Sequence, residues 1–194
     1  MAQVLKEELR LAILRAAQNE FLEYGYLLSS VKRIAAKVGI SAGNLYRYYD
    51  GKEALFDSVV NPVYAELEGV IGANGEDSLT EGDVFDLVVN TLMSLIEGFR
   101  EPLLILIDGS KGTRHEDGVL KLHKMMADHV TEHLIAYNSR QSGEVYTEQV
   151  SWPIGVAFMQ GYFEIIRRCP DPKDCRSVLS QYVSFWYQGL RSFV

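Results

Sequence analysis

Apolar residues recur every three or four positions along most of the chain, the spacing of amphipathic helices. The first such stripe begins at Leu5 and continues to Tyr24. Gly25 follows it directly, and glycine is the residue that most often stands just past a helix end. The pattern therefore predicts one long helix over residues 4–24.

Two short helices joined by a glycine turn are predicted next. Ser29 and Ser30 offer hydroxyls that can cap the first of them. Gly39 permits the positive φ that a tight exit from this helix requires. The buried face repeats at helical spacing through Val31, Ile34, Ala35 and Val38.

Ser41 is placed to cap the second short helix, which buries Leu45 and Tyr49 four positions apart. Small Ala35 stands where the two helices would cross. Two short helices around a glycine turn form the pattern of a helix-turn-helix.

The remainder of the chain is also helical in pattern. Asp50-Gly51 breaks the third helix, and a fourth runs through Phe56 to Leu67 and joins the two parts of the chain. The predicted fold is all-α, with a helix-turn-helix domain at 1–52 and an effector-binding and dimerisation bundle at 53–194. Further helices are expected at about 81–99, 101–108, 115–139, 147–168 and 173–192.

Composition narrows the class of protein. The 194 residues are 47% hydrophobic, enough for a full core, yet the longest apolar run, "PLLILI", is far too short to span a membrane. The charged N-terminus differs from a signal peptide, and two cysteines do not make a disulfide scaffold. We expect a cytoplasmic protein with no membrane association.

The net charge of −7 is unevenly distributed. Residues 1–60 carry a net +1 and the remainder −8, and residues 25–52 alone carry +4. Phosphate backbones attract local positive charge. The asymmetry permits DNA binding by the N-terminal part, although a solvated basic face would look the same.

The stretch "GISAGNLYRYYDGKE" presents many hydrogen-bonding side chains beside its two buried positions. The second helix of a helix-turn-helix enters the major groove of DNA. Gly43 would allow close approach, Asn44 suits an adenine edge, and Arg47 suits guanine or phosphate. Hydroxyls and amines suited to phosphate oxygens are offered by Tyr46, Tyr48, Lys52, Ser30 and Lys32.

At these residues the sequence resembles the TetR family of transcriptional regulators. The stretch from Ile13 to Phe56 follows the family's N-terminal signature, with "RIAAKVGIS", "LYRYY" and "KEAL" in register. The resemblance implies a dimer that binds operator DNA and releases it when a small molecule enters the C-terminal domain. It places DNA contacts at Ser41, Gly43, Asn44, Tyr46, Tyr48 and Lys52, with Tyr48 standing where many members have histidine and Arg47 at a more variable position.

The last two predicted helices are apolar around most of their circumference, too much for a helix with one solvated face. Gly155, Gly161 and Gly189 would let helices pack closely. Two such helices from each of two chains would form a four-helix interface. We therefore expect a homodimer, the alternative being that these helices form the bundle's own core.

No motif after residue 60 specifies a ligand. Adaptable and aromatic side chains are typical of apolar effector cavities, although for any single one of them ordinary core is the commoner role. The expected effector is a largely apolar small molecule, with contacts at Met93, Phe99, Met125, His129, Phe158 and Tyr162.

Neither the histidines nor the cysteines make a recognisable site by spacing alone. His129 and His133 stand at i, i+4, which can hold a metal on one helix face, but a third ligand is missing. Cys169 and Cys175 could form a thiol-sensing pair or be spectators. We expect no cofactor, no resident metal and no catalytic residue.

Two other classes of function remain open at this point. An enzyme built on His129 and His133 would need a nucleophile–base pair that the sequence lacks. An adaptor would use its helix-turn-helix to bind protein instead of DNA.

Overall fold

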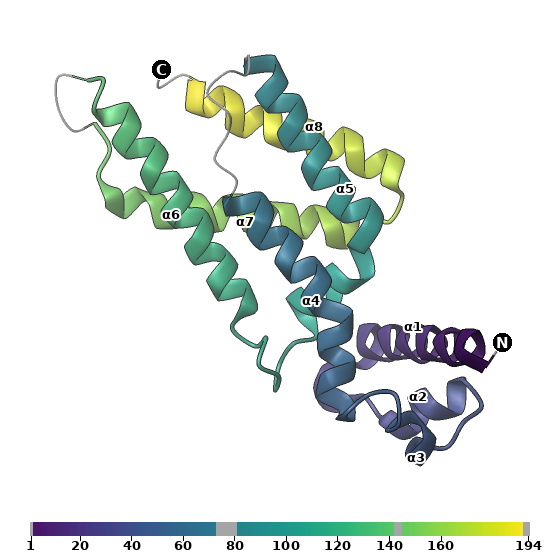
Figure 1. Cartoon of the computed structure of the whole chain (residues 1–194). Helices are drawn as coiled ribbons and strands as arrows, with labels where there is room; N and C mark the ends of the chain where they lie inside the picture. The colour runs from purple at the N-terminus through teal and green to yellow at the C-terminus, as the bar shows by residue number, and fades with distance from the viewer. Residues whose placement is uncertain (1, 73–80, 142–144, 192–194) are drawn as a thin grey trace. The chain divides into compact units, whose positions relative to one another are not determined.

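The computed structural model describes residues 2–72, 81–141 and 145–191, and within these ranges all regular structure is helical, as the all-α prediction requires. The side chain of Leu5 lies outside the described set. No described helix is long and apolar enough to cross a membrane. The elements in chain order (Figure 1) are α1 Ala2–Leu28, α2 Val31–Lys37, α3 Ala42–Leu45, α4 Gly51–Gly72, α5 Glu81–Asp108, α6 Gly118–Asn138, the 3₁₀ turn η1 Glu148–Val150, α7 Ser151–Arg168 and α8 Pro172–Arg191.

The chain groups into two compact units that are not continuous in sequence. The N-terminal unit comprises Met1–Ala65 and Glu101–Gly118, and the C-terminal unit comprises Glu66–Arg100 and Val119–Val194. The units therefore divide within α4 and α5. The boundary that the sequence predicts after residue 52 separates two functional domains, not two compact units. It stays a prediction.

The core of the N-terminal unit joins α1, the helix-turn-helix and the start of α4. Ile13, Ala17 and Phe21 of α1 are buried, and the Phe21 ring meets the Phe56 ring edge-on at 5.1 Å between centroids. The predicted stripe ends earlier than expected, because Tyr24 is 40% exposed. Its ring instead lies under the guanidinium of Arg33, 4.5 Å from the centroid.

Residues 101–118 belong to the N-terminal unit because two sets of contacts hold them there. The backbone N–H of Tyr26 donates to the carbonyl of Gly109 at 2.9 Å. Arg114 donates through both Nε and Nη2 to the buried carboxylate of Asp57, and His115 Nε2 lies 2.9 Å from the same carboxylate. The sequence pattern gave no sign of this long-range association.

The helices predicted at 81–99 and 101–108 form one element with a kink. Phe99 has non-helical angles (φ −138°, ψ 20°), and Pro102 follows three residues later inside α5. Proline lacks the N–H that would bond to the carbonyl four residues earlier, and its ring crowds that carbonyl. The break was therefore located correctly, but the helix resumes after it.

Glycines on α7 permit close packing inside the chain. A Cβ on Gly155 would lie 2.8 Å from the backbone nitrogen of Ala127 in α6, and one on Gly161 would collide with the hydroxyl of Tyr182 in α8. Gly189 has open space around it. The close helix packing predicted at Gly155 and Gly161 thus occurs within one chain. The predicted dimer interface of α7 and α8 is a separate question.

Candidate DNA-binding site

The turn between α2 and α3 has the backbone that the sequence predicts. Gly39 adopts a φ of +72°, in the left-handed region where other residues are strained. The amide of Ile40 then donates back to the carbonyl of Ala35 at 3.0 Å, which closes the turn. Ile34 and Ala35 are buried and fix α2 against the core.

Ser41 caps α3 as predicted, its Oγ accepting the backbone N–H of Asn44 at 3.1 Å. Regular α-helix extends only over Ala42–Leu45. Tighter turns continue the coil, since the amides of Tyr48 and Tyr49 both donate to the carbonyl of Leu45, at 2.9 and 3.2 Å. The recognition element is therefore short and pre-formed.

Leu45 and Tyr49 anchor this element to the core. Leu45 is fully buried and Tyr49 is 6% exposed. The Tyr49 hydroxyl donates to the carbonyl of Arg10 in α1 at 3.2 Å, and the Arg10 guanidinium lies 5.6 Å from the tyrosine ring centroid. The opposite side of the element consequently faces solvent.

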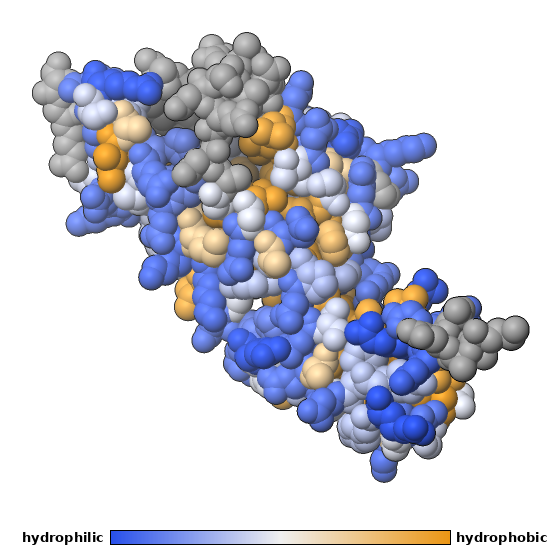
Figure 2. Space-filling model, in the orientation of Figure 1, coloured by the Kyte–Doolittle hydropathy of each residue, from blue (hydrophilic) through white to orange (hydrophobic). Residues whose placement is uncertain are grey.

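We call this solvent-facing side the α3 face, made of Gly43, Asn44, Tyr46, Arg47 and Tyr48. Tyr46 is 54% exposed, Gly43 and Arg47 are also exposed, and Asn44 and Tyr48 are half-buried. In the view of Figure 2, hydrophilic residues predominate on the visible surface of the N-terminal unit. The predicted geometry is therefore present: Leu45 and Tyr49 point into the core, and the residues of the α3 face point outward.

Gly43 has no packing reason to be glycine. A Cβ built on it would meet only the Ser41 Oγ, at 3.9 Å, and its φ is not positive. Alanine would favour the helix by about 0.8–1 kcal/mol over glycine. The chain itself therefore gains nothing from a missing side chain here, whereas a surface approached closely from outside would.

Glu20 organises α2 from inside the unit, a role the sequence pattern concealed. Its side chain is fully buried, and it accepts the backbone N–H of Ser30 at 3.0 Å, Arg33 Nε at 2.7 Å and Lys37 Nζ at 3.3 Å. Ser30 is the N-cap residue, but its hydroxyl makes no capping bond. The predicted serine caps of α2 are thus wrong: Glu20 accepts the Ser30 amide, and the Ser29 hydroxyl donates to the carbonyl of Tyr26.

The surroundings of Glu20 favour its charged form. Burial acts to raise the pKa of this carboxyl, but the hydrogen bonds from Arg33, the Ser30 amide and Lys37, with the charge of Arg33, outweigh burial and hold the pKa below its ordinary 4.5. Residues 25–52 contain five lysines and arginines, and two of them, Arg33 and Lys37, are therefore paired internally. The free positive charge of this segment is smaller than the sequence count suggested.

Lys52 also has internal partners. Its Nζ donates to the carbonyls of Tyr26 and Ser29, at 2.7 and 3.2 Å, and lies 4.2 Å from the Tyr26 ring centroid. Partial burial lowers the pKa of this amine. An ammonium group has three N–H donors, so one remains for a phosphate after the two carbonyls are satisfied.

Lys32 and Arg47 are the cations of the segment most available to a partner. Both are exposed, and neither forms an ion pair with any residue in the described ranges. Arg47 lies on the α3 face, and Lys32 lies in the first turn of α2. These two side chains can meet phosphates without breaking an internal bond.

The six side chains expected to bind an effector lie in the C-terminal unit and differ in accessibility. Met93 and Tyr162 are fully buried, and the Tyr162 hydroxyl donates to the carbonyl of Leu92 at 2.9 Å. Burial strongly raises the pKa of this phenol. The other four, Phe99, Met125, His129 and Phe158, are half-buried.

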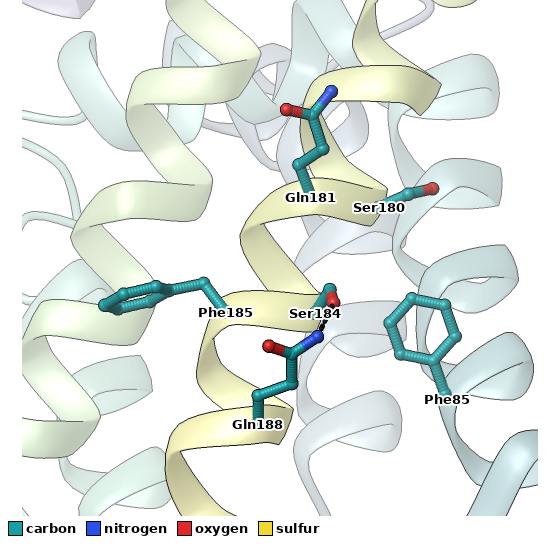
Figure 3. A pocket seen from close by; sticks show the side chains of 6 residues that line it. All are labelled: Phe85, Ser180, Gln181, Ser184, Phe185 and Gln188. Atoms are coloured by element: carbon teal, nitrogen blue, oxygen red, sulfur yellow. Dashed lines mark hydrogen bonds between the residues drawn. The ribbon is translucent and has the colours of Figure 1, made fainter.

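None of the six lines the pocket between α5 and α8. This pocket has a volume of about 460 Å³, and polar side chains of α8 make up most of its wall (Figure 3). Phe185, at its rim, is 74% exposed. The hollow is a feature of the surface, lined by Phe85, Ser180, Gln181, Ser184, Phe185 and Gln188.

The cysteines lie close together but in unreactive surroundings. Cys175 is fully buried, and its thiol donates to the carbonyl of Cys169. Burial, with the neighbouring Cys169, raises the pKa of the Cys175 thiol to about 11. Because the thiolate is the reactive form, the Cys175 thiol is poorly suited to sensing oxidants.

Comparison with known proteins identifies the N-terminal unit. The family described as "Bacterial regulatory proteins, tetR family" matches residues 13–59. The HTH-type transcriptional repressor Rv1474c of Mycobacterium tuberculosis is 34% identical over 89 residues, which cover 43% of this chain and 47% of that protein. The HTH-type transcriptional regulator UidR of Escherichia coli is 28% identical over 141 residues, covering 70% of this chain and 68% of its own length. The matched region thus spans about half of the first relative and two thirds of the second.

Solved structures share the whole fold. NalD, the secondary repressor of the MexAB-OprM multidrug efflux pump in Pseudomonas aeruginosa, is 22% identical with a TM-score of 0.59, covering 92% of this chain and 94% of that chain. SCO3833, a TetR-family member from Streptomyces coelicolor, is 18% identical with a TM-score of 0.69, covering 91% of this chain and 90% of that chain.

These relatives are named as a transcriptional repressor and a transcriptional regulator. The helix-turn-helix signature, the relatives and the fold agree with the exposed α3 face. The match to the TetR family of bacterial regulatory proteins thus covers residues 13–59, and the fold as a whole resembles that of solved TetR-family regulators.

Proposed function

We propose that this protein is a ligand-responsive repressor that binds palindromic operator DNA as a homodimer and leaves it when a small-molecule effector binds. The α3 face carries the proposal: Leu45 and Tyr49 point inward and leave a pre-formed polar surface outward. Two relatives are named as repressors, which favours repression over activation.

Each exposed residue of the α3 face has a chemical role in this proposal. Gly43 lets the backbone approach the major groove, Asn44 reaches a base edge, and Arg47 reaches a guanine edge or a phosphate. Tyr46 and Tyr48 donate to phosphates and fix the position of the helix. Ser41, Ser30, Lys32 and the third N–H of Lys52 add phosphate contacts around it.

The second half of the proposal concerns the C-terminal unit. A largely apolar effector binds among Met93, Phe99, Met125, His129, Phe158 and Tyr162. Because Met93 and Tyr162 are fully buried here, the effector selects a more open arrangement of these side chains. That is a population shift between a DNA-binding and a non-binding form.

Fluorescence anisotropy with labelled duplex DNA from the gene's own upstream region tests the DNA contacts. We expect Arg47→Ala to weaken binding about tenfold or more and to reduce the slope of log affinity against log salt by about one. The matched control is Arg140→Ala, which removes an exposed arginine from the C-terminal unit and should leave binding unchanged.

Gly43→Ala gives a sharper test because stability and binding should change independently. Alanine is the better helix former by about 0.8–1 kcal/mol, so thermal unfolding should show equal or higher stability. DNA affinity should nevertheless fall about tenfold or more, since the new methyl lies where the duplex approaches. Gly69→Ala in α4, another glycine with open space around it, should leave DNA affinity unchanged.

If Gly43→Ala and Arg47→Ala both bound DNA with wild-type affinity, the α3 face would not be the DNA-binding surface. If an intact dimer shifted no duplex at all, the helix-turn-helix would be a protein-binding adaptor instead.

A further inference from the structure

The histidine pair on α6 has a geometry that the sequence spacing left open. His129 Nε2 and His133 Nε2 lie 3.1 Å apart, and the ring planes are inclined at 80°. The ring centroids are 4.6 Å apart. With one nitrogen protonated, this contact is a hydrogen bond between the rings. The centroids are only 1.5 Å further apart than the nitrogens (4.6 minus 3.1 Å), so the ring axes are inclined to the N···N line rather than collinear with it. A single ion in contact with both nitrogens requires the same inclination.

We propose that His129 and His133 bind one divalent transition-metal ion, such as Cu²⁺, Ni²⁺ or Zn²⁺, through their two Nε2 atoms. Metal–imidazole bonds are about 2.0–2.1 Å long, so nitrogens at this separation subtend an angle of about 100° at the ion. That angle lies between the square-planar preference of Cu²⁺ and the tetrahedral preference of Zn²⁺.

The surroundings of the pair suit a metal ligand. Burial, with the nearby His133, lowers the pKa of His129, which favours the neutral imidazole that metals require. The carboxylate of Glu132 acts in the opposite direction on this pKa and adds negative charge that favours a cation. His133 is exposed, so ions reach the site from solvent.

The site has two protein ligands, with water at the remaining positions. Within the described ranges no cluster of three or more metal-ligating side chains is present. Affinity should therefore be moderate and follow the general order in which Cu²⁺ binds more tightly than Ni²⁺ or Zn²⁺. The inference does not rest on the proposed effector response, but the two sites share a residue, because a bound ion would occupy His129, which is also proposed to contact the effector.

Calorimetric titration of the tag-free protein with Cu²⁺ and Zn²⁺ tests the proposal. We expect one ion per chain in the wild type and at least a tenfold loss of affinity in His129→Ala and in His133→Ala. Electron paramagnetic resonance of the Cu²⁺ complex should show coupling to two imidazole nitrogens.

The control is a double variant, His133→Ala with Ala136→His, which keeps the number of histidines on α6. Residues 129 and 136 are seven apart, about 10 Å along the helix, and cannot chelate one ion. Ala136 is exposed, so the substitution should leave the fold intact. If this variant binds Cu²⁺ as tightly as the wild type, or if the resonance spectrum shows a single imidazole, the two-histidine site does not exist.

Discussion

Glu20 illustrates how one side chain can define the N-terminal unit. It is a fully buried carboxylate that accepts three hydrogen bonds, two of them from cations and one from the backbone at the start of α2. Removing one member of a buried ion pair leaves the other members without a partner. The orientation of α2, and with it the turn that presents α3, therefore depends on a residue that never faces DNA.

Glu20→Gln should lower the free energy of unfolding by about 1–3 kcal/mol at neutral pH, because a charged acceptor is replaced by a neutral one. The folded-state pKa of Glu20 lies below its ordinary 4.5, so its stabilisation is present above that pH and is lost as the pH falls through the lowered pKa. Urea unfolding should therefore show the difference between variant and wild type shrinking below pH 4.5.

Glu8→Gln, at an exposed position of the same helix, supplies the control and should leave stability nearly unchanged. A Glu20→Gln protein as stable as the wild type at neutral pH would show that the buried network contributes nothing.

Lys52 combines a structural role with its proposed phosphate contact. Two of its three donors hold the carbonyls of the α1–α2 turn. Lys52→Ala would therefore remove structural bonds along with a proposed phosphate contact. Reduced DNA binding in that variant says little by itself, whereas Arg47→Ala removes a side chain without internal ion pairs in the described residues.

At the scale of elements, α7 packs closely against both α6 and α8. Gly155 lies against the backbone of α6, and Gly161 lies against the Tyr182 side chain of α8. The Tyr182 hydroxyl donates to the carbonyl of Phe158 on α7, at 2.7 Å. These contacts fix the bundle that would hold an effector.

Gly155→Ala should destabilise the protein by about 1–3 kcal/mol, because the added methyl would lie 2.8 Å from a backbone nitrogen that cannot rotate away. Gly161→Ala should cost less, since the obstructing Tyr182 is a side chain that can move. Thermal unfolding of both variants checks this order, with Gly98→Ala, which has open space around it, as the reference. A larger loss in Gly161→Ala would mean that Tyr182 is held more rigidly than the α6 backbone.

At the scale of the whole molecule, α8 is the surface on which we expect dimerisation. Phe185 is 74% exposed and Val178 is 42% exposed. They stand seven residues apart and therefore share one face of the helix. Two recognition elements must reach successive major grooves for tight operator binding. Dimerisation and DNA affinity should therefore be lost together.

Phe185→Glu should convert the dimer to a monomer and weaken operator binding more than tenfold while leaving the fold intact, because the side chain is mostly solvent-exposed in one chain. Sedimentation velocity and anisotropy measure the two effects. Leu120→Glu, at an exposed apolar position of α6, should change neither. A Phe185→Glu protein that sediments as a dimer would place the interface elsewhere.

Local signals in the sequence were sufficient for the helix-turn-helix. Gly39 was identified because only glycine adopts a φ of +72° without strain, and Ser41 because its hydroxyl can reach an amide three residues on. Leu45 and Tyr49 followed from helical spacing alone. Such features depend on neighbours within a few residues, which is why periodicity and capping chemistry predict them.

Long-range contacts were decided only by the tertiary structure. No local pattern indicates that Glu20 accepts from Ser30 and Arg33, that Asp57 holds Arg114, or that residues 101–118 join the N-terminal unit. Each pairing depends on where distant segments meet, and a charged residue on a helix has the same spacing whether its partner is water or a buried cation. The sequence by itself determined the helices and the α3 face, and the packing of those helices determined which of their charges remain free to bind.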